Sequence, residues 1–321
     1  MDQVPFIFME KVVSLLPSDP REIQPNFASV GGLWKTAADE LEANYHYVKV
    51  FINPQEHSMS VSKVSPRRDE VELFEEPDRY TLDLSIQISD LDDGHPKAEP
   101  EAITEERLKQ ITRLPSRGSF YSHFIVNGLP PRQNEVFNFG SFLRNLHAHF
   151  AVMNLWGCLG YSQEIEELMR NLIPKRTCGR FSFMNMDLTP TCVDLLMDTW
   201  DTCLPFDRRG KNGYPSFMLR LTDCSKTLSR AQISRVLNGW SEGRGGFGLQ
   251  MSSSEFPDID AFFQTFDVKE PQWTIEVRED RSCQIQSNAG ISIAVHYLPA
   301  DGGGLPGLSL MIQGDALVSS Q

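Results

Sequence analysis

The sequence has no long apolar run and no paired-cysteine motif, and each absence excludes a class of protein. No stretch approaches the ~18 apolar residues that a helix needs to cross a bilayer, and the longest candidate, 150–161, is interrupted by Asn154. The six cysteines form no C-x-x-C pair, which argues against a zinc site of that spacing and against a disulfide framework. We therefore predict reduced, mostly buried thiols and no contact with the membrane.

Basic residues are also scarce. The chain has 30 Lys and Arg against 43 Asp and Glu, a net charge of −13, which argues against general affinity for nucleic acid or anionic lipid. The apolar start at 4–8 meets Glu10 and Lys11 at once and has no basic leader, so we expect no signal peptide. The rest of the composition is that of a globular protein, and we expect it in the cytoplasm or nucleus.

What the sequence does contain is a repeated helical pattern. Five segments carry apolar residues at positions i, i+3, i+4 and i+7, the spacing of one helix face, and each follows a short strand-like run. No such unit can hide its apolar stripe alone, so the units are expected to stack. The five sets are Phe139/Phe142/Leu143/Leu146, Ile165/Leu168/Met169/Leu172, Val193/Leu196/Met197/Trp200, Ile233/Val236/Leu237/Trp240 and Ile259/Phe262/Phe263/Phe266.

Helix start signals agree with this placement. Thr104, Asn138 and Thr189-Pro190 are N-cap candidates, and Ser229-x-x-Gln232 has the spacing of a capping box. The expected strands of the array lie near 120–126, 150–155, 180–184, 216–221, 246–251 and 273–278. Two runs at 283–287 and 291–298 are expected to form a hairpin that caps the open edge.

These signals predict an α/β fold in which leucine-rich-repeat-like strand–helix units stack after two smaller N-terminal segments. Residues 80–88 alternate strictly and predict a strand with one buried and one wet face. Residues 90–101 are rich in Asp, Glu and Pro and predict a mobile acidic loop. The expected segments are a helical one at 1–45, a β-rich region with the acidic loop at 46–103, the array with its closing hairpin at 104–298, and a flexible tail at 299–321.

Motifs that carry chemistry are weak. Gly243 to Gly248 fits G-x-G-x-x-G, but it follows a helix and leads into a strand, the reverse of the order in a dinucleotide site. His147 and His149 diverge on a helix end and lack a third ligand of suitable spacing. We therefore expect no cofactor, no metal site and no enzyme activity, with an enzyme of unknown class as the alternative.

The N-terminal residues resemble a degenerate F-box. The stretch from Val4-Pro5 to Leu15-Leu16-Pro17 is similar to that family's opening Leu-Pro and first apolar helix, although Val4 replaces the usual leucine. Phe27, Val30 and Trp34 are similar to its later apolar and tryptophan signature. The Met-Asp-x-Val-Pro-Phe start, together with the strand–helix units, also resembles a large, divergent nematode family of F-box-like proteins.

This resemblance implies a substrate-recognition subunit of an SCF-type ubiquitin ligase. The F-box would dock on a Skp1-like adaptor, and the C-terminal domain would select a protein target. An alternative is a repeat-built scaffold that has lost its coupling to the ligase, which Gly31-Gly32 and the prolines at 20 and 25 favour. Carried over by position, the adaptor-binding residues are Pro5, Phe6, Val12, Leu15, Leu16 and Trp34.

A target would meet the outward side chains of the repeat strands if these form one curved sheet. The inward set on parity is Phe181, Phe217, Leu219, Leu221, Phe247 and Leu249. Ser182 points outward only if Phe181 and Phe183 both point inward. The candidate target-binding residues are Ser182, Met218, Arg220 and Gln250.

Overall fold

The structure is a computed structural model in which the chain divides into two compact units, Met1–Cys178 (unit 1) and Gly179–Gln321 (unit 2). This division differs from the segments expected above, because the β-rich region and the first strand–helix units share unit 1. The residues that the structure describes are 32–65, 70–75, 80–90, 99–114, 122–129, 138–146, 148, 150–172, 180–202, 217–241, 247–252, 273–279, 282–287, 292–298 and 307–313.

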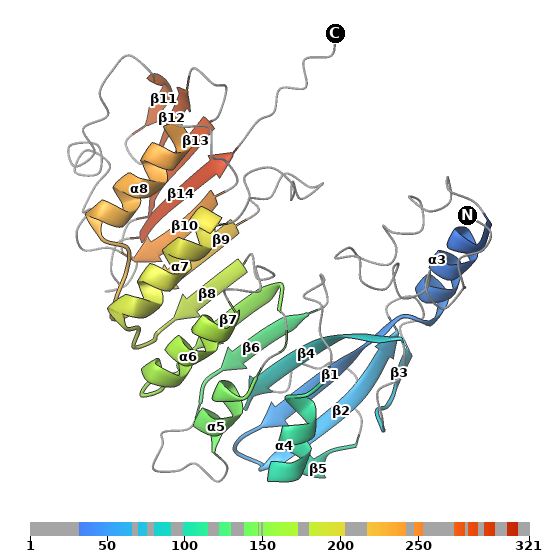
Figure 1. The fold of residues 1–321 in the computed structure, drawn as a ribbon. Helices are drawn as coiled ribbons and strands as arrows, with labels where there is room; N and C mark the ends of the chain where they lie inside the picture. Colours follow the sequence, from blue (N-terminus) through green and yellow to red (C-terminus); the bar gives the residue numbers. More distant parts are fainter. Residues whose placement is uncertain are drawn as a thin grey trace. The chain divides into compact units, whose positions relative to one another are not determined.

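Unit 1 is a mixed sheet with helices (Figure 1). Its elements in chain order are α3 (Gly32–Asn44), β1 (His46–Asn53), β2 (Ser58–Ser65), β3 (Glu70–Leu73), β4 (Thr81–Ser89), β5 (Glu101–Ala102), α4 (Glu105–Ile111), β6 (His123–Asn127), α5 (Phe139–Arg144), β7 (Val152–Trp156) and α6 (Ser162–Leu172).

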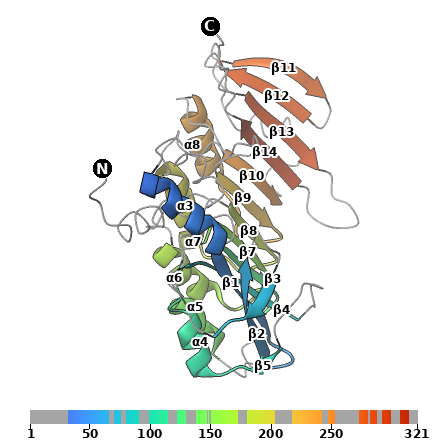
Figure 2. The same ribbon diagram turned by 90° about the vertical axis from the view of Figure 1, so that its right-hand side faces the viewer.

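The strands of unit 1 follow the order β7-β6-β4-β1-β2-β3. The neighbours from β7 to β1 are parallel, whereas β2 and β3 are added antiparallel and β5 pairs with β2. Helices α5 and α6 pack beside each other and lie on the same side of β6 and β7 (Figures 1 and 2). The expected strand at 80–88 is therefore β4, and it pairs in parallel with β1 of the expected β-rich region.

Strand β4 is buried on both faces, which corrects the expectation of one wet face. Leu84, Ile86 and Ile88 are fully buried as predicted, but Thr81 and Asp83 on the other face are also almost completely buried. Buried polar groups must find hydrogen-bond partners. The alternation predicts the inward residues correctly, but it carries no information about what covers the polar face.

Asp83 is the centre of a buried polar cluster at the beginning of the parallel strands. Its carboxylate accepts hydrogen bonds from the Tyr45 hydroxyl, at 2.8 Å, and from the Ser122 hydroxyl. Beside it, His46 Nε2 lies 2.7 Å from Thr81 Oγ1. Tyr45 follows α3, and Ser122 precedes β6, so one carboxylate connects three parts of the chain that are far apart in sequence.

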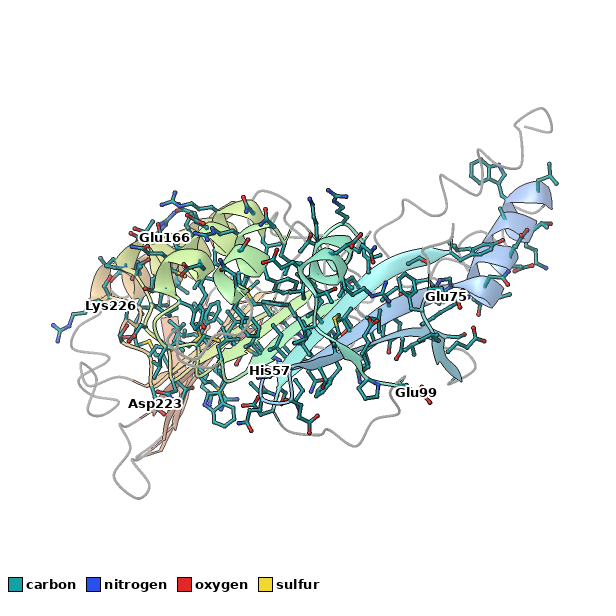
Figure 3. All side chains as sticks on the ribbon, turned by 90° about the horizontal axis from the view of Figure 1, so that it is seen from below. His57, Glu75, Glu99, Glu166, Asp223 and Lys226 are labelled. Carbon is teal, nitrogen blue, oxygen red and sulfur yellow. The ribbon has the colours of Figure 1, made fainter. Side chains whose placement is uncertain are left out.

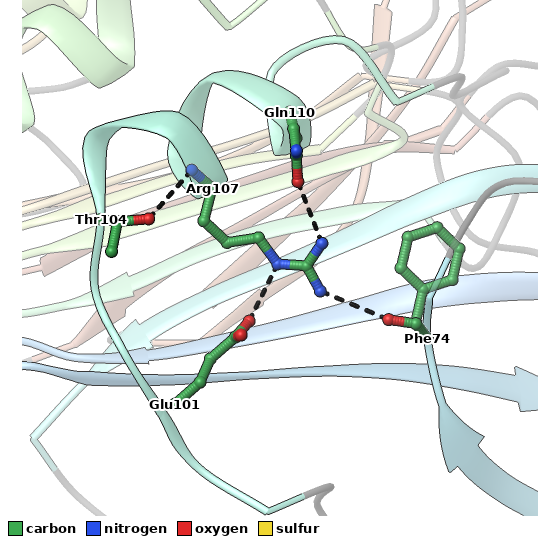
Figure 4. Close-up of polar contacts among 5 residues, drawn as sticks. All are labelled: Phe74, Glu101, Thr104, Arg107 and Gln110. Carbon is green, nitrogen blue, oxygen red and sulfur yellow. Dashed lines mark hydrogen bonds and ion pairs between the residues drawn. The ribbon is translucent and has the colours of Figure 1, made fainter.

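Arg107 anchors α4 to its surroundings (Figure 4). Its guanidinium donates to Glu101 Oε1 at 2.9 Å and to the Phe74 carbonyl at 3.3 Å, and its backbone N–H donates to the Thr104 hydroxyl, confirming the predicted N-cap. Glu101 belongs to β5 and pairs with Met59. The end of the expected acidic loop is thus a strand residue in an ion pair.

Unit 2 continues the alternation of strands and helices and then changes to antiparallel strands. Its elements are β8 (Arg180–Met184), α7 (Pro190–Thr202), β9 (Phe217–Thr222), α8 (Arg230–Ser241), β10 (Phe247–Ser252), β11 (Trp273–Glu279), β12 (Ser282–Ser287), β13 (Ser292–Leu298) and β14 (Gly307–Gln313). Strands β8, β9 and β10 are parallel, and α7 and α8 lie on one side of them (Figure 2).

The last strand closes this parallel ladder. The predicted hairpin is present as β12 and β13, but β14 pairs antiparallel with both β10 and β13. The expectation of a flexible tail is therefore wrong for 307–313, and the hairpin does not itself cover β10. Pairing on both sides gives every backbone group of β14 access to a neighbour, which a free sheet edge lacks.

The helix stripes and caps are confirmed wherever the residues are described. All four apolar residues of the sets on α5 and α6 are buried, as are the first three on α7 and the first two on α8. The side chains of Trp200, Leu237 and Trp240, and the whole fifth set at 259–266, lie outside the described residues. Asn138, Thr189 and the Ser229/Gln232 box make the predicted capping hydrogen bonds.

Polar contacts join the outer sides of neighbouring helices. Between α7 and α8, Gln232 donates to Asp194 at 2.7 Å and Arg235 lies 3.3 Å from Asp198.

Among the residues described, no helix is long and apolar enough to span a membrane. The α/β class with stacked strand–helix units is confirmed.

The Asp83 cluster generates a prediction about stability. Replacing Asp83 by alanine removes the acceptor of two buried hydroxyls, and we expect the free energy of unfolding to fall by about 2–5 kcal/mol. Urea denaturation followed by circular dichroism measures this change. Glu99→Ala, at an exposed position labelled in Figure 3, is the control and should stay within about 0.5 kcal/mol. An equally small effect of Asp83→Ala would contradict the role of the cluster.

Candidate interaction face

Strands β8, β9 and β10 place alternate side chains on opposite sides of their sheet. Phe181 and Phe183 of β8 are buried, and the rings lie 6.2 Å apart between centroids. Leu219 and Leu221 of β9 and Leu249 of β10 are buried as well. Helices α7 and α8 lie on one side of these strands (Figure 2). The buried side chains indicate that side, so by alternation the intervening residues form the opposite one.

We call this opposite side the unit 2 face. Its described members are Arg180, Ser182, Met184, Met218, Arg220, Thr222 and Gln250. Arg180 is exposed, and the other six are half-buried. All four residues predicted to meet a target therefore lie together on this face, and the condition set for Ser182 is met because both flanking phenylalanines are buried.

The parallel register arranges the face in rows that cross the strands. Ser182, Arg220 and Gln250 pair in sequence across β8, β9 and β10 and form the central row. Arg180 pairs with Met218 on one side of it, and Met184 pairs with Thr222 on the other. Sequence parity found members of these rows but missed Arg180, Met184 and Thr222, although their parity is the same as that of Ser182 and Arg220.

The described side chains of the unit 2 face carry a formal positive charge. Strands β8, β9 and β10 contain two arginines and no acidic residue, in a chain whose net charge is −13. Arg220 Nε donates to Thr222 Oγ1 at 3.4 Å, which is a long hydrogen bond. Because Thr222 is two residues further along β9, the guanidinium of Arg220 lies along its own strand. The hydroxyl and amide groups of Ser182, Thr222 and Gln250 add hydrogen-bonding capacity.

A left-handed residue follows each described parallel strand from β6 to β9. The positions are Gly128, Gly157, Asn185 and Asp223, with φ of 83°, 65°, 50° and 52°. Glycine adopts this conformation without strain, and Asn and Asp tolerate it better than other residues. This repeated Gly, Gly, Asn, Asp signal is visible in the sequence and was missed. In each case the left-handed residue directly follows the last residue of its strand.

The turns are also bonded to neighbouring strands and turns. In unit 1 the Gly128 N–H donates to the Trp156 carbonyl at 2.7 Å, and in unit 2 the Asn185 N–H donates to the Thr222 carbonyl at 2.9 Å. Ser225 continues the second ladder, because its N–H donates to the Met186 carbonyl and its hydroxyl accepts from the Leu188 N–H. These bonds hold the chain where β6 and β8 leave the sheet. Asp223, at the end of β9, is labelled in Figure 3.

The three described thiols near these turns are free and mostly buried. Cys158, Cys192 and Cys224 are free, and Cys158 and Cys192 are buried. Burial raises the pKa of Cys158 to about 12 and that of Cys224 to about 11, so both are protonated at neutral pH and are poor nucleophiles. The expectation of reduced, mostly buried thiols is confirmed for these three residues. The thiols of Cys178, Cys203 and Cys283 lie outside the described part.

Other ligand motifs of the sequence gain no support. The described part of the chain holds no cluster of three or more His, Cys, Asp or Glu side chains able to bind a metal ion. His147 and His149 lie outside it. The glycine-rich run from Gly243 stands between the end of α8 and the start of β10, the order opposite to that of a dinucleotide site.

The residues predicted to bind an adaptor are mostly outside the described residues. Pro5, Phe6, Val12, Leu15 and Leu16 fall in the segment 1–31, which the structure does not describe. Trp34 lies in the first turn of α3 and is half-buried, next to Leu33, which is 45% exposed. Helix α3 begins at Gly32, whose φ is 57°. The buried side of α3 consists of Ala37, Ala38 and Leu41.

Comparisons with protein-family models, curated proteins and solved structures found no match to this chain. The site is therefore interpreted from its own residues.

The left-handed turns generate a second prediction. Asn185→Val puts a β-branched residue at φ of 50°, and we expect it to lower the free energy of unfolding by about 1–2 kcal/mol. Asn185→Gly should be neutral or slightly stabilising. Ser182→Val, the matched change at a strand position, should have little effect. Equal urea midpoints for the two valine variants would contradict the proposed constraint.

Proposed function

We propose that the chain is a protein-interaction module and that the unit 2 face binds its protein target. One observation carries the proposal: helices cover one side of β8–β10 (Figure 2), and exposed or half-buried side chains of the opposite parity stand in registered rows. Parallel sheets are normally covered on both faces. Stacked strand–helix arrays are an exception, and they use such surfaces to bind partners.

The residue types of the unit 2 face support binding. Arginine and methionine are enriched in protein interfaces, whereas lysine and acidic residues are depleted. The face combines Arg180 and Arg220 with Met184 and Met218. The raised pKa values of Cys158 and Cys224 keep both thiols protonated, which argues only against these two residues as nucleophiles. An enzyme of unknown class remains the less favoured alternative.

We further propose that the N-terminal segment couples the module to a Skp1-like adaptor, as a substrate-recognition subunit of an SCF-type ligase in the cytoplasm or nucleus. The support is the resemblance of residues 4–34 to a degenerate F-box. On α3, the exposed Leu33 beside the half-buried Trp34 offers apolar surface of the kind that binds by becoming buried. The alternative is a scaffold without this coupling.

Site-specific photo-crosslinking tests the target-binding proposal. A crosslinking amino acid at Ser182 or Gln250 should capture the same partner from native lysate, and the purified partner should bind the wild-type chain. The same group at Ala231, exposed on α8, is the control. Replacing Met218 by aspartate should weaken binding of the purified partner at least tenfold, because it puts a charge into the contact. Equal capture at all three positions would contradict the assignment.

Adaptor binding is tested separately by pull-down with purified Skp1. We expect the wild-type chain to bind and the Leu15→Asp/Leu16→Asp variant to fail, because two charges in the apolar surface must be desolvated. Trp34→Ala should weaken binding, while Lys35→Ala, exposed on the same helix, should not. Absent binding, or binding that survives the double aspartate change, would favour the scaffold without ligase coupling.

A further inference from the structure

We infer that the target segment recognised by the unit 2 face is an acidic peptide in an extended conformation. This inference rests on the proposed function, because it specifies the partner of the same face. Three observations lead to it: the sign of the charge, the spacing of the two arginines, and the groups that surround them.

The charge of the face is opposite to that of the protein. The described members of the face include Arg180 and Arg220 and no acidic side chain, while the chain as a whole carries −13. A positive patch in a negative molecule selects partners by local complementarity, because the long-range field repels other acidic molecules. A carboxylate-bearing segment that reaches this patch gains the local attraction.

The two arginines stand at a spacing that suits an extended chain. They lie on neighbouring strands in adjacent rows, because Arg220 pairs with Ser182 and Arg180 is two residues before Ser182. Neighbouring strands are about 4.8 Å apart and alternate residues about 7 Å apart, which places the two α-carbons on the order of 8 Å from each other. Alternate side chains of an extended peptide are also about 7 Å apart. The spacing of successive carboxylates on one side of the peptide is therefore close to that of the two arginine α-carbons.

The chemistry around the arginines fits carboxylates and peptide backbone. A guanidinium binds a carboxylate through two parallel hydrogen bonds, a geometry that lysine lacks. Ser182 and Gln250 flank Arg220 in the central row and offer donors and acceptors to the peptide. Met184 and Met218 supply adaptable apolar surface between the charged positions.

A single-stranded nucleic acid also carries repeated negative charges, but the residues favour a peptide. Nucleic-acid grooves combine many basic residues with aromatic side chains on which bases stack. The described members of the unit 2 face include two basic residues and no aromatic one. The net charge of −13 also opposes a polyanion that extends beyond the face.

Fluorescence anisotropy with the full-length chain tests the inference. The probe is a fluorescein-labelled peptide of alternating glutamate and serine, and its partner probe has lysine in place of glutamate. We expect the wild-type chain to bind the glutamate peptide at least tenfold more tightly, with an affinity that falls as salt is added. Arg180→Glu/Arg220→Glu should reverse this preference. Reversal shows that the variant is folded and that charge at these positions selects the peptide.

Matched variants complete the design. Arg113→Glu/Lys226→Glu makes the same change in net charge at exposed positions outside the face, with Lys226 extending into solvent in Figure 3. It should bind the glutamate peptide like the wild type. Arg180→Lys/Arg220→Lys keeps the charge but loses the bidentate geometry, and it should bind more weakly than wild type.

Three results would overturn the inference: equal binding of both peptides, unchanged preference in the double glutamate variant, or tighter binding of polyuridylate than of the glutamate peptide. These outcomes are distinct from failure of the proposed function. Binding of the partner captured at Ser182 could be weakened by the Met218 change but not by the two arginine changes. In that case the unit 2 face binds a target, but it does not recognise acidic residues of that target. If neither change matters, both proposals fail.

Discussion

The structure depends on the burial of apolar side chains where the helices pack on the sheet. These side chains come from the apolar stripes of the helices and from the inward positions of the strands. Each buried Leu, Ile, Val, Phe or Met contributes about 1.5–3 kcal/mol relative to an exposed one, but no single strand–helix unit has enough such surface to fold alone. In unit 2, Leu219 and Leu221 on β9 and Val193 and Leu196 on α7 are essentially inaccessible to water. Because strand side chains alternate, the same burial that holds β8–β10 in place also fixes which residues are presented on the opposite side.

The ends of the strands make this arrangement regular. The left-handed residues Gly128, Gly157, Asn185 and Asp223 end their strands at equivalent positions, and within each unit hydrogen bonds join one strand end to the next. Capping groups at Asn138, Thr189 and Ser229 then start the helices. A shift of one residue in any of these connections would move that strand's polar set to the buried side. The turns therefore determine which side chains lie on the unit 2 face as well as which lie in the core.

Local periodicity made most of the parallel strands and their helices predictable. The strand expected at 180–184 coincides with β8 and that at 216–221 is displaced by one residue from β9, because alternation and helix caps are signals of neighbouring residues. Long-range partners are not encoded in this way. Nothing near Gly307 indicates that β14 pairs with β10, and nothing near Asp83 indicates that Tyr45 and Ser122 cover it. The parity of Ser182 and Arg220 was predictable, whereas their shared row required the register.

In the proposed function, the buried side of β8–β10 serves stability and the opposite side serves recognition. Substitutions at surface positions outside special features usually change the free energy of unfolding by less than about 0.5 kcal/mol, whereas a residue at the centre of an interface can contribute about 2 kcal/mol or more to binding. Phe181 and Phe183 are buried and contribute to stability, whereas Ser182 between them lies on the face that we propose binds a partner. The residue types on the unit 2 face are therefore not dictated by the fold. Two arginines on three strands that contain no acidic residue fit the acidic partner proposed for this face.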